Sequence, residues 1–182
     1  MGAYRLATLD DASRLYHIRR RSILELAPPS MPAVEAEIWA AKLTRAGMER
    51  KLRELEVWVA EPGGTVAGWD AIRDNLLEGL YTAPEFAGRG IGAGLLERLM
   101  RERGFPSVYL EASPNARGFY LRRGYRATGP QTPQGAWPMV KEHFDWRRRE
   151  NNCDGQRPGT DSRSSRSRRL IFIPRGATLT PA

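Results

Sequence analysis

Hydrophobic residues follow two different periods along residues 1–146. Three segments place apolar residues three and four positions apart, as on one face of a helix: 8–26, 30–52 and 91–103. Short runs rich in β-branched and aromatic residues predict strands at 4–7, 55–60, 65–72, 76–82, 108–112, 125–128 and 139–144. The order of these elements predicts an α/β fold, with a central mixed sheet of about six to seven strands and helices on both faces.

Cap and turn residues mark where several of these elements begin or end. Thr8 followed by Asp11 is typical of a capping box at a helix start. The stretch 62–64, Pro-Gly-Gly, lies between two strands and predicts a hairpin. Gly47 is expected to interrupt the helical stretch at 30–52, because glycine is a poor helix former.

The helix at 91–103 has a clear two-sided pattern. Its apolar face comprises Leu95, Leu96, Leu99 and Met100. Its other face is expected to carry two ion pairs between residues four apart, Glu97–Arg101 and Arg98–Glu102. Gly94 lies inside the helix, where glycine costs roughly 1 kcal/mol relative to alanine. This cost predicts that a group packs against the backbone there, and a phosphate is the natural guest.

Net charge is concentrated at one end of the chain. The 182 residues hold 29 Lys plus Arg and 21 Asp plus Glu, a net charge of +8. Residues 147–182 contain nine arginines and three acids, so they carry +6 of this charge and leave +2 for residues 1–146. Low-complexity Arg/Ser sequence at 162–169 predicts a disordered C-terminal tail over 147–182, separate from a domain at 1–146. Such a tail is either a solvated extension or an arm that binds nucleic acid electrostatically.

Several functional classes are excluded by composition. The single cysteine, Cys153, forms no internal disulfide, and no window holds 18 consecutive apolar residues. The first residues lack the basic start and apolar stretch of a signal peptide, so we expect a cytoplasmic protein without a membrane partner. No His, Cys and Asp spacing predicts a metal site.

The most informative segment joins the strand at 76–82 to the helix at 91–103. It holds four glycines in seven residues: Gly88, Gly90, Gly92 and Gly94. The first turn of a helix has unpaired N–H groups and the positive end of the helix dipole, and glycines let an anion approach closely. The segment is neither a Walker loop nor a good dinucleotide fingerprint, because Leu95 replaces the third glycine of the latter. Tight helix packing is the alternative role of these glycines.

A second segment, 110–125, contains Asn115-Ala116-Arg117-Gly118-Phe119-Tyr120 and ends in Gly124-Tyr125. Together, the two segments resemble the GNAT superfamily of acyl-CoA-dependent N-acetyltransferases, and the resemblance covers residues 1–146. Gly90 and Gly92 match the small positions of the family's pyrophosphate motif. Ala87 departs from it, because Gln or Arg is usual there, and Arg89 is a substitute source of charge.

The resemblance implies a GNAT fold and transfer of an acetyl group from the co-substrate acetyl-CoA to a primary amine. It implies that pyrophosphate binds the backbone of Gly88, Arg89, Gly90, Ile91, Gly92 and Ala93. The pantetheine arm is expected to pair with the strand edge at Leu80, Tyr81 and Thr82, where an N–H polarises the thioester carbonyl. Ser113-Pro114 predicts the start of a short helix that Gly124 ends. Asn115 is expected to hydrogen-bond the pantetheine, or otherwise to lie at the exposed start of this helix.

Acid and base candidates follow from the same resemblance. Tyr120 is the expected general acid that protonates the departing CoA thiolate. Glu78 and Glu111 are the candidate general bases, with a water chain as the alternative. His17 and His143 are expected to be structural, and Cys153 has no histidine nearby to activate it as a nucleophile.

Acceptor recognition is expected from residues 20–54 and 128–140, with Trp39, Trp69 and Trp137 as possible pocket walls or core residues. The acceptor is a small-molecule or peptide amine of unspecified identity, and the protein is expected to be a monomer or a homodimer. Two other functions stay open. One is a non-catalytic acyl-CoA-binding module, and the other is nucleic-acid binding through the tail.

Overall fold

The computed structural model describes residues 3–28 and 30–142. Its strands are β1 Tyr4–Leu6, β2 Glu56–Ala60, β3 Gly68–Arg73, β4 Leu76–Thr82, β5 Ser107–Ala112, β6 Arg126–Ala127 and β7 Trp137–Glu142. Its helices are α1 Ala12–Leu26, α2 Ala33–Ala41, α3 Arg45–Glu54, α4 Ile91–Arg103 and α5 Pro114–Leu121. Short 3₁₀ turns lie at Leu9–Asp11, Pro62–Gly64 and Pro84–Phe86.

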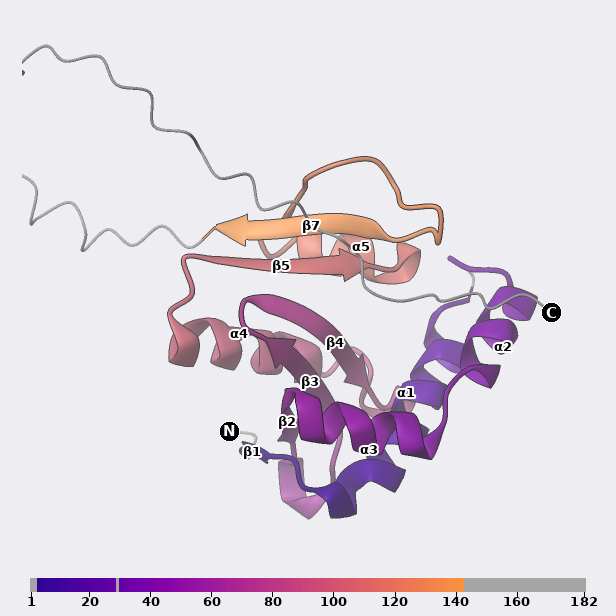
Figure 1. The fold of residues 1–182 in the computed structure, drawn as a ribbon, viewed down its shortest axis with the longest axis vertical. Coiled ribbons are helices and arrows are strands. Elements are labelled where there is room, and N and C mark those ends of the chain that lie inside the picture. The colour runs from indigo at the N-terminus through magenta and orange to yellow at the C-terminus, as the bar shows by residue number, and fades with distance from the viewer. Residues whose placement is uncertain (1–2, 29, 143–182) are drawn as a thin grey trace, which may run out of the picture. The chain divides into compact units, whose positions relative to one another are not determined.

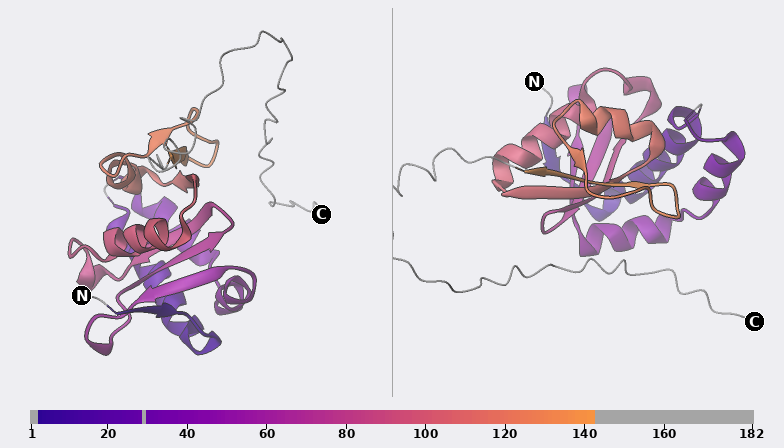
Figure 2. Two further views of the ribbon diagram at one scale, coloured as in Figure 1. Left: turned by 90° about the vertical axis from the view of Figure 1, so that its left-hand side faces the viewer. Right: turned by 90° about the horizontal axis from the view of Figure 1, so that it is seen from above.

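The seven strands form one mixed sheet in the order β1-β2-β3-β4-β5-β7-β6. Neighbouring strands are antiparallel except for β4 and β5, which run parallel. Helices α1 and α3 pack on one face of the central strands, and α4 packs on the opposite face (Figure 1, Figure 2). This arrangement confirms the predicted mixed α/β sheet with helices on both faces.

Each face of the sheet has its own hydrophobic core. Trp69 and Val57 belong to the core beneath α1 and α3, where they contact buried residues such as Leu15 and Met48. The core beneath α4 and α5 contains Leu96, Leu99, Val108, Leu110, Ala112, Tyr120, Tyr125 and Met139. Alternate residues of a strand point to opposite faces. The core to which a strand residue or its neighbour belongs therefore shows which face its side chain points to.

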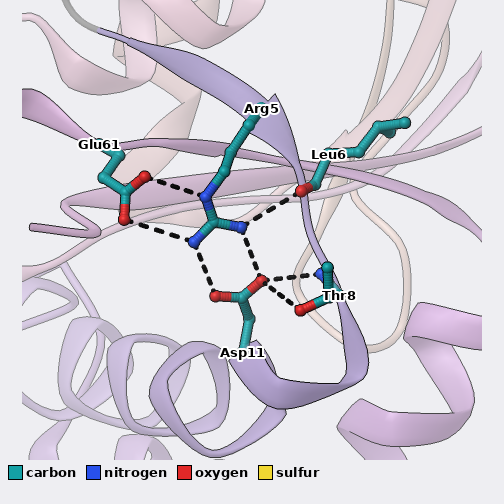
Figure 3. A network of polar contacts seen from close by, with 5 residues as sticks. All are labelled: Arg5, Leu6, Thr8, Asp11 and Glu61. Atoms are coloured by element: carbon teal, nitrogen blue, oxygen red, sulfur yellow. Dashed lines mark hydrogen bonds and ion pairs between the residues drawn. The ribbon is translucent and has the colours of Figure 1, made fainter. Parts of the chain in front are cut away.

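The start of α1 is held by the predicted capping box and by an arginine network. The Asp11 carboxylate accepts hydrogen bonds from the Thr8 N–H at 2.8 Å and from the Arg5 guanidinium at 2.8 and 2.9 Å. Arg5 also donates to Glu61 at 2.9 Å (Figure 3). The network joins β1, α1 and the β2–β3 connection. The hydrogen bonds from Arg5 lower the pKa of Asp11, so this acid stays ionised.

The predicted break in the second helical stretch lies elsewhere than Gly47. The chain leaves helix after α2, and Thr44 is the N-cap of α3. Its hydroxyl accepts a hydrogen bond from the Gly47 N–H at 3.0 Å. Gly47 is therefore the third residue of α3, and the Thr44 cap decides the boundary because it satisfies a free N–H of the first turn.

Two predictions for α4 were wrong. Arg98 is 1% exposed and pairs with Asp70 of β3 beneath the helix, so it belongs to the buried face, although its pair with Glu102 forms as expected at 2.7 Å. At Gly94, a Cβ would overlap the Tyr4 hydroxyl. The group that packs on the α4 backbone is therefore the Tyr4 side chain of β1, which leaves no room for a phosphate.

The tail at 147–182, its boundary with the domain, and both Cys153 and His143 lie outside the described residues. The last predicted strand is described up to Glu142, the end of β7. None of the described helices is long and apolar enough to cross a membrane.

Candidate active site

A gap between two parallel strands is the central feature of the site. β4 and β5 pair at two positions, and the pairing ends at Leu77 and Leu110. Beyond that point β4 continues beside β3 as far as Thr82, and β5 continues beside β7 as far as Ala112. The two strands therefore diverge toward their carboxyl ends (Figure 1), and each leaves one edge without a partner strand in the described part of the chain.

The free edge of β4 presents two of the three predicted backbone positions. Ala83 donates its N–H to Ala67 beside β3, and the Tyr81 carbonyl lies against Gly68 of β3. Because backbone groups alternate sides along a strand, the N–H and C=O groups of Leu80 and Thr82 point toward β5. The backbone groups of these two residues are thus free to pair with an extended ligand, while Tyr81 contributes its side chain to the α1 face.

A β-bulge lies on β4 just ahead of the gap. Leu77 and Gly79 pair with the consecutive residues Ile72 and Ala71 of β3, so Glu78 is the extra residue. Bulges turn a strand and redirect a side chain. The Glu78 carboxylate is 3.3 Å from Lys51 of α3 and 3.3 Å from Arg73. Its two ion pairs bind it to the α3 side of the sheet.

The glycine-rich turn places a row of free N–H groups at the end of β4. Gly90, with φ of 81°, is the N-cap of α4, and the first helical bond runs from Gly94 to the Gly90 carbonyl. Among the described residues, no hydrogen-bond acceptor is found for five backbone N–H groups, those of Gly88, Gly90, Ile91, Gly92 and Ala93. A helix start with this many free donors has the backbone groups needed to bind an anion.

Arg89 contributes to this cradle through its side chain. Its own N–H donates to the Phe86 carbonyl at 3.3 Å and is not available to a ligand. Its guanidinium lies 5.7 Å from the centre of the Phe86 ring, is exposed, and has no carboxylate partner in the described part of the chain. Arg89 therefore supplies a positive charge beside Ala87, where the family motif has Gln or Arg.

Gly92 connects the cradle with the gap between the strands. A Cβ at this position would be 3.5 Å from Thr82 Oγ1, 3.7 Å from Phe119 Cζ and 3.9 Å from Leu80 Cδ2. The free helix start, the end of β4 and α5 thus meet at one point. A ligand that lies on the N–H groups of α4 reaches the gap along this line.

Tyr120 borders the gap from the α4–α5 face. It belongs to the same core as Leu110 and Ala112 of β5, and its ring meets Tyr125 edge to face at 5.4 Å. Its hydroxyl makes no hydrogen bond with the described residues. Burial raises the pKa of Tyr120 well above its usual value, so the phenol keeps its proton at every physiological pH.

Asn115 lies at the start of α5, which directly follows β5. Its amide N–H donates to the Leu26 carbonyl of α1 at 3.4 Å, and its carbonyl accepts from the Ser113 hydroxyl at 2.7 Å. The start of α5 is thereby joined to the end of α1. Asn115 is exposed at the start of α5.

Glu111 lies on the face opposite Tyr120. Leu110 and Ala112 point into the core beneath α4 and α5, so Glu111 between them points to the α1 face. It is exposed and has no ion pair within the described residues, in contrast to Glu78. The gap therefore has a phenol on one face and a free carboxylate on the other.

The remaining predicted residues are divided between core and surface. Trp69 is fully buried and donates its indole N–H to the Leu15 carbonyl at 3.2 Å, so it is a core residue rather than a pocket wall. Trp39 and Trp137 are half-buried, and His17 is exposed on α1. No cluster of three metal-ligating side chains occurs in the ranges 3–28 and 30–142.

Sequence reasoning did not anticipate two arginines near the site. Arg19 of α1 lies 5.3 Å above the Tyr81 ring, and Arg117 of α5 lies 4.4 Å above the Trp137 ring. In each, the Nε atom is buried without a hydrogen-bond acceptor in the described part of the chain. In the sequence, Arg19 is one of three consecutive arginines at 19–21 that are expected to face solvent, and no local signal distinguishes it from the other two.

The described residues thus form a mixed sheet that opens between two parallel strands and is followed by a glycine-rich helix start. A family model for the acetyltransferase (GNAT) domain matches residues 28–141. This chain therefore belongs to the GNAT acetyltransferase family, as its motifs predict.

Relatives and solved structures agree with this assignment. The uncharacterised N-acetyltransferase YafP of Escherichia coli is 25% identical over 129 residues, which cover 70% of this chain and 84% of YafP. A GCN5-related N-acetyltransferase from Rhodopseudomonas palustris aligns with a TM-score of 0.70 and 26% identity, over 79% of this chain and 96% of its own. The PaiA N-acetyltransferase of Thermoplasma acidophilum, solved with coenzyme A, shares the fold with a TM-score of 0.65 and 21% identity, over 79% and 99%.

Proposed function

We propose that this protein transfers an acetyl group from acetyl-CoA to the primary amine of an acceptor, by direct attack of the amine on the thioester. The observation that carries the proposal is the gap between β4 and β5, which opens directly ahead of the glycine-rich start of α4. Coenzyme A in the related PaiA structure supports the choice of donor.

Binding of the donor is assigned to backbone groups. The free N–H groups around Gly90 and Gly92, with the Arg89 guanidinium beside them, hold the pyrophosphate. The pantetheine amides pair with the free edge of β4 at Leu80 and Thr82 in the manner of an additional strand. A β4 N–H at this edge stabilises the oxyanion that forms when the thioester carbonyl is attacked.

The chemical step uses the two faces of the gap. The amine approaches from the α1 face, its nitrogen bonds to the carbonyl carbon, and the carbon–sulfur bond breaks as CoA leaves. The Tyr120 hydroxyl, on the opposite face, donates a hydrogen bond to the departing thiolate. The raised pKa of this phenol makes full proton transfer to sulfur uphill, so hydrogen bonding carries part of the effect.

The proton of the attacking amine goes to a base on the acceptor side. Of the two candidates, Glu111 is the better supported, because it is exposed beside the gap and has no ion pair among the described residues. Glu78 holds Lys51 and Arg73 and would have to release them to accept a proton. A water molecule beside Glu111 would serve the same purpose.

Two measurements test the proposal. Acetyl-CoA at 100 times its dissociation constant should stabilise the protein by about 2.7 kcal/mol in a thermal-shift titration. A panel of primary amines should then release free CoA thiol at rates that depend on the amine. Stabilisation without amine-dependent release from any acceptor would instead identify a non-catalytic acyl-CoA-binding module. The absence of stabilisation would contradict donor binding itself.

A matched pair of variants tests the base. Glu111→Gln should lower kcat by about 10²- to 10⁴-fold, the usual range for a general base, whereas Glu78→Gln should leave kcat within a few-fold. Equal losses in both variants, or none in Glu111→Gln, would reject the assignment to Glu111.

A further inference from the structure

Among the arginines and lysines on the α1 face of the described residues, Arg19 of α1 is the one whose side chain is partly buried and has no carboxylate partner. Its guanidinium lies 5.3 Å from the centre of the Tyr81 ring, and its Nε atom is buried without an acceptor among residues 3–28 and 30–142. A buried donor that lacks a partner is costly, because it has lost water and gained no bond. An incoming oxygen ligand would remove that cost.

The neighbouring arginine of the same helix is treated differently. Arg21 pairs with Glu25 at 2.8 Å and with Glu85 at 2.9 Å. Arg19 forms no ion pair with any carboxylate of residues 3–28 and 30–142. Two positions along one helix therefore separate an arginine with two acidic partners from an arginine with none.

Positive charge surrounds Arg19. Lys51 of α3 is close enough that the charge of Arg19 helps to lower the pKa of this lysine, although burial is the larger cause. Arg73 adds a third cation, and the facing acid is Glu78, which binds both Lys51 and Arg73. Glu54 pairs with Arg73 at 3.7 Å. The cations of this cluster outnumber its acids, and the excess lies at Arg19.

The cluster lies on the acceptor face of the gap. Tyr81, which carries Arg19 on its ring, follows Leu80 on the free edge of β4. The Tyr81 side chain and Glu111 point to the same α1 face of the sheet, because Leu80 and Leu110 point to the other. An acceptor that presents its amine to the gap therefore passes Arg19.

We infer that Arg19 binds a carboxylate of the acceptor, so that the acceptor is an amino acid or another amine that carries an acidic group. The inference rests on the proposed acetyl transfer and names the substrate class of the same site. The guanidinium fork suits a carboxylate, and its stacking on Tyr81 holds it ready at little entropic cost. Arg19 is thus a specificity residue, and it takes no part in bond making.

The experiment compares acceptors that differ by one group. L-alanine, L-phenylalanine and L-leucine are each assayed for thiol release against two counterparts that lack a carboxylate, the α-amide and the decarboxylated amine. These two bracket the amino acid in amine basicity. With the wild type, the best amino acid should exceed both counterparts by about 10- to 100-fold in kcat/KM.

Two variants one residue apart connect this preference with Arg19. Arg19→Gln should abolish it by raising the KM of the amino acid, with little change for the neutral amines or for acetyl-CoA. Arg20→Gln removes the same charge from an exposed position and should leave the preference unchanged. Neutral amines used as well as amino acids, or an effect of Arg19→Gln on acetyl-CoA alone, would overturn the inference.

A binding measurement separates this inference from the proposed function. N-acetyl amino acids should stabilise the wild type in the presence of CoA more than they stabilise Arg19→Gln, while N-acetyl amides should stabilise both equally. If no amine releases CoA, acetyl transfer is wrong, and a carboxylate-dependent difference in binding still supports the role of Arg19. No such difference in binding would reject that role.

Discussion

Arg98 and Arg19 lie on opposite faces of the same central strands and share an unusual setting. Arg98 lies 4.0 Å from the centre of the Trp58 ring, and Arg19 lies 5.3 Å from that of Tyr81. Both have a buried Nε without an acceptor among the described residues. Arg98, however, pairs with Asp70 at 3.3 Å and with Glu102 at 2.7 Å, whereas Arg19 pairs with no carboxylate there.

The difference separates a structural group from a binding group. Carboxylates of the protein itself neutralise the charge of Arg98, so removal of Arg98 leaves Asp70 buried without a cation. The charge of Arg19 is left for a ligand, so its removal costs binding more than stability. Two tyrosines repeat the contrast: the Tyr125 hydroxyl lies 3.9 Å from the Met100 sulfur, whereas the Tyr120 hydroxyl has no partner in the described part of the chain.

The largest expected effect concerns the stability of the Arg98 side. Arg98→Met should lower the free energy of unfolding by about 3–5 kcal/mol, because it leaves a buried carboxylate without its cation. Arg19→Met should cost less than about 1 kcal/mol, the value of a cation–π contact. Urea unfolding of both variants measures the difference.

Two controls accompany this prediction. Arg101→Met removes an exposed arginine from the same helix and should be close to neutral. Adding Asp70→Leu to Arg98→Met should recover most of the loss, since an apolar pair replaces the ionic one. Equal losses in Arg98→Met and Arg19→Met would show that the two arginines do not differ in the proposed way.

The second prediction uses the two tyrosines. Tyr120→Phe should lower kcat about 10- to 1000-fold while acetyl-CoA still stabilises the protein. Because burial raises the pKa of Tyr120, this loss should be the same at every pH between about 6 and 9. Tyr125→Phe is the matched control, and its kcat should stay within a few-fold of the wild type. An unchanged kcat in Tyr120→Phe would reject its role as the acid.

The third prediction concerns the pH dependence of stability at Asp70. Burial raises the pKa of Asp70 to about 6, so the folded protein binds this proton more tightly than the unfolded chain does. Ionisation of Asp70 therefore opposes folding. Its cost is fully present above pH 6 and disappears as the pH falls from about 6 to about 4. The free energy of unfolding should therefore rise by about 2–3 kcal/mol on acidification, because each pKa unit between the folded and unfolded states contributes about 1.36 kcal/mol.

Unfolding of the wild type and of Asp70→Asn across this pH range isolates the effect. Other carboxylates, such as Asp11 with its lowered pKa, act in the opposite direction but do so in both proteins. The contribution of Asp11 therefore cancels in the difference between the two curves, which follows the titration of Asp70 alone. A constant difference from pH 4 to pH 7 would show that Asp70 titrates normally.

The smallest expected effect comes from giving Arg19 a partner of its own. Ser22 lies three residues further along α1, so Ser22→Glu places a carboxylate within reach of Arg19. The preference for acidic acceptors should fall about tenfold, with stability within about 0.5 kcal/mol of the wild type. Ser22→Gln has the same size without the charge and should keep the preference. Thiol-release assays that show equal preference in both variants would contradict the role of Arg19.

Local sequence signals predicted those elements whose partners lie nearby in the chain. The capping box of Thr8 and Asp11 spans four residues, and the Gly90 helix start follows from glycines within one turn. The break between α2 and α3 was misplaced at Gly47, because the cap at Thr44 outweighs the propensity of one glycine. These features are decided by neighbours, so a short stretch of sequence contains them.

The sequence by itself determined the mixed α/β order, the glycine-rich helix start and the positions of Tyr120 and Glu111 at the ends of their elements. Tertiary structure decided that Gly94 makes room for Tyr4, that Arg98 finds Asp70 28 residues away, and that Arg19 pairs with no acid of the described residues. From sequence alone, any arginine is expected to be exposed to solvent. Whether an acid neutralises its charge depends on which residues folding brings beside it, and spacing along the chain does not contain that information.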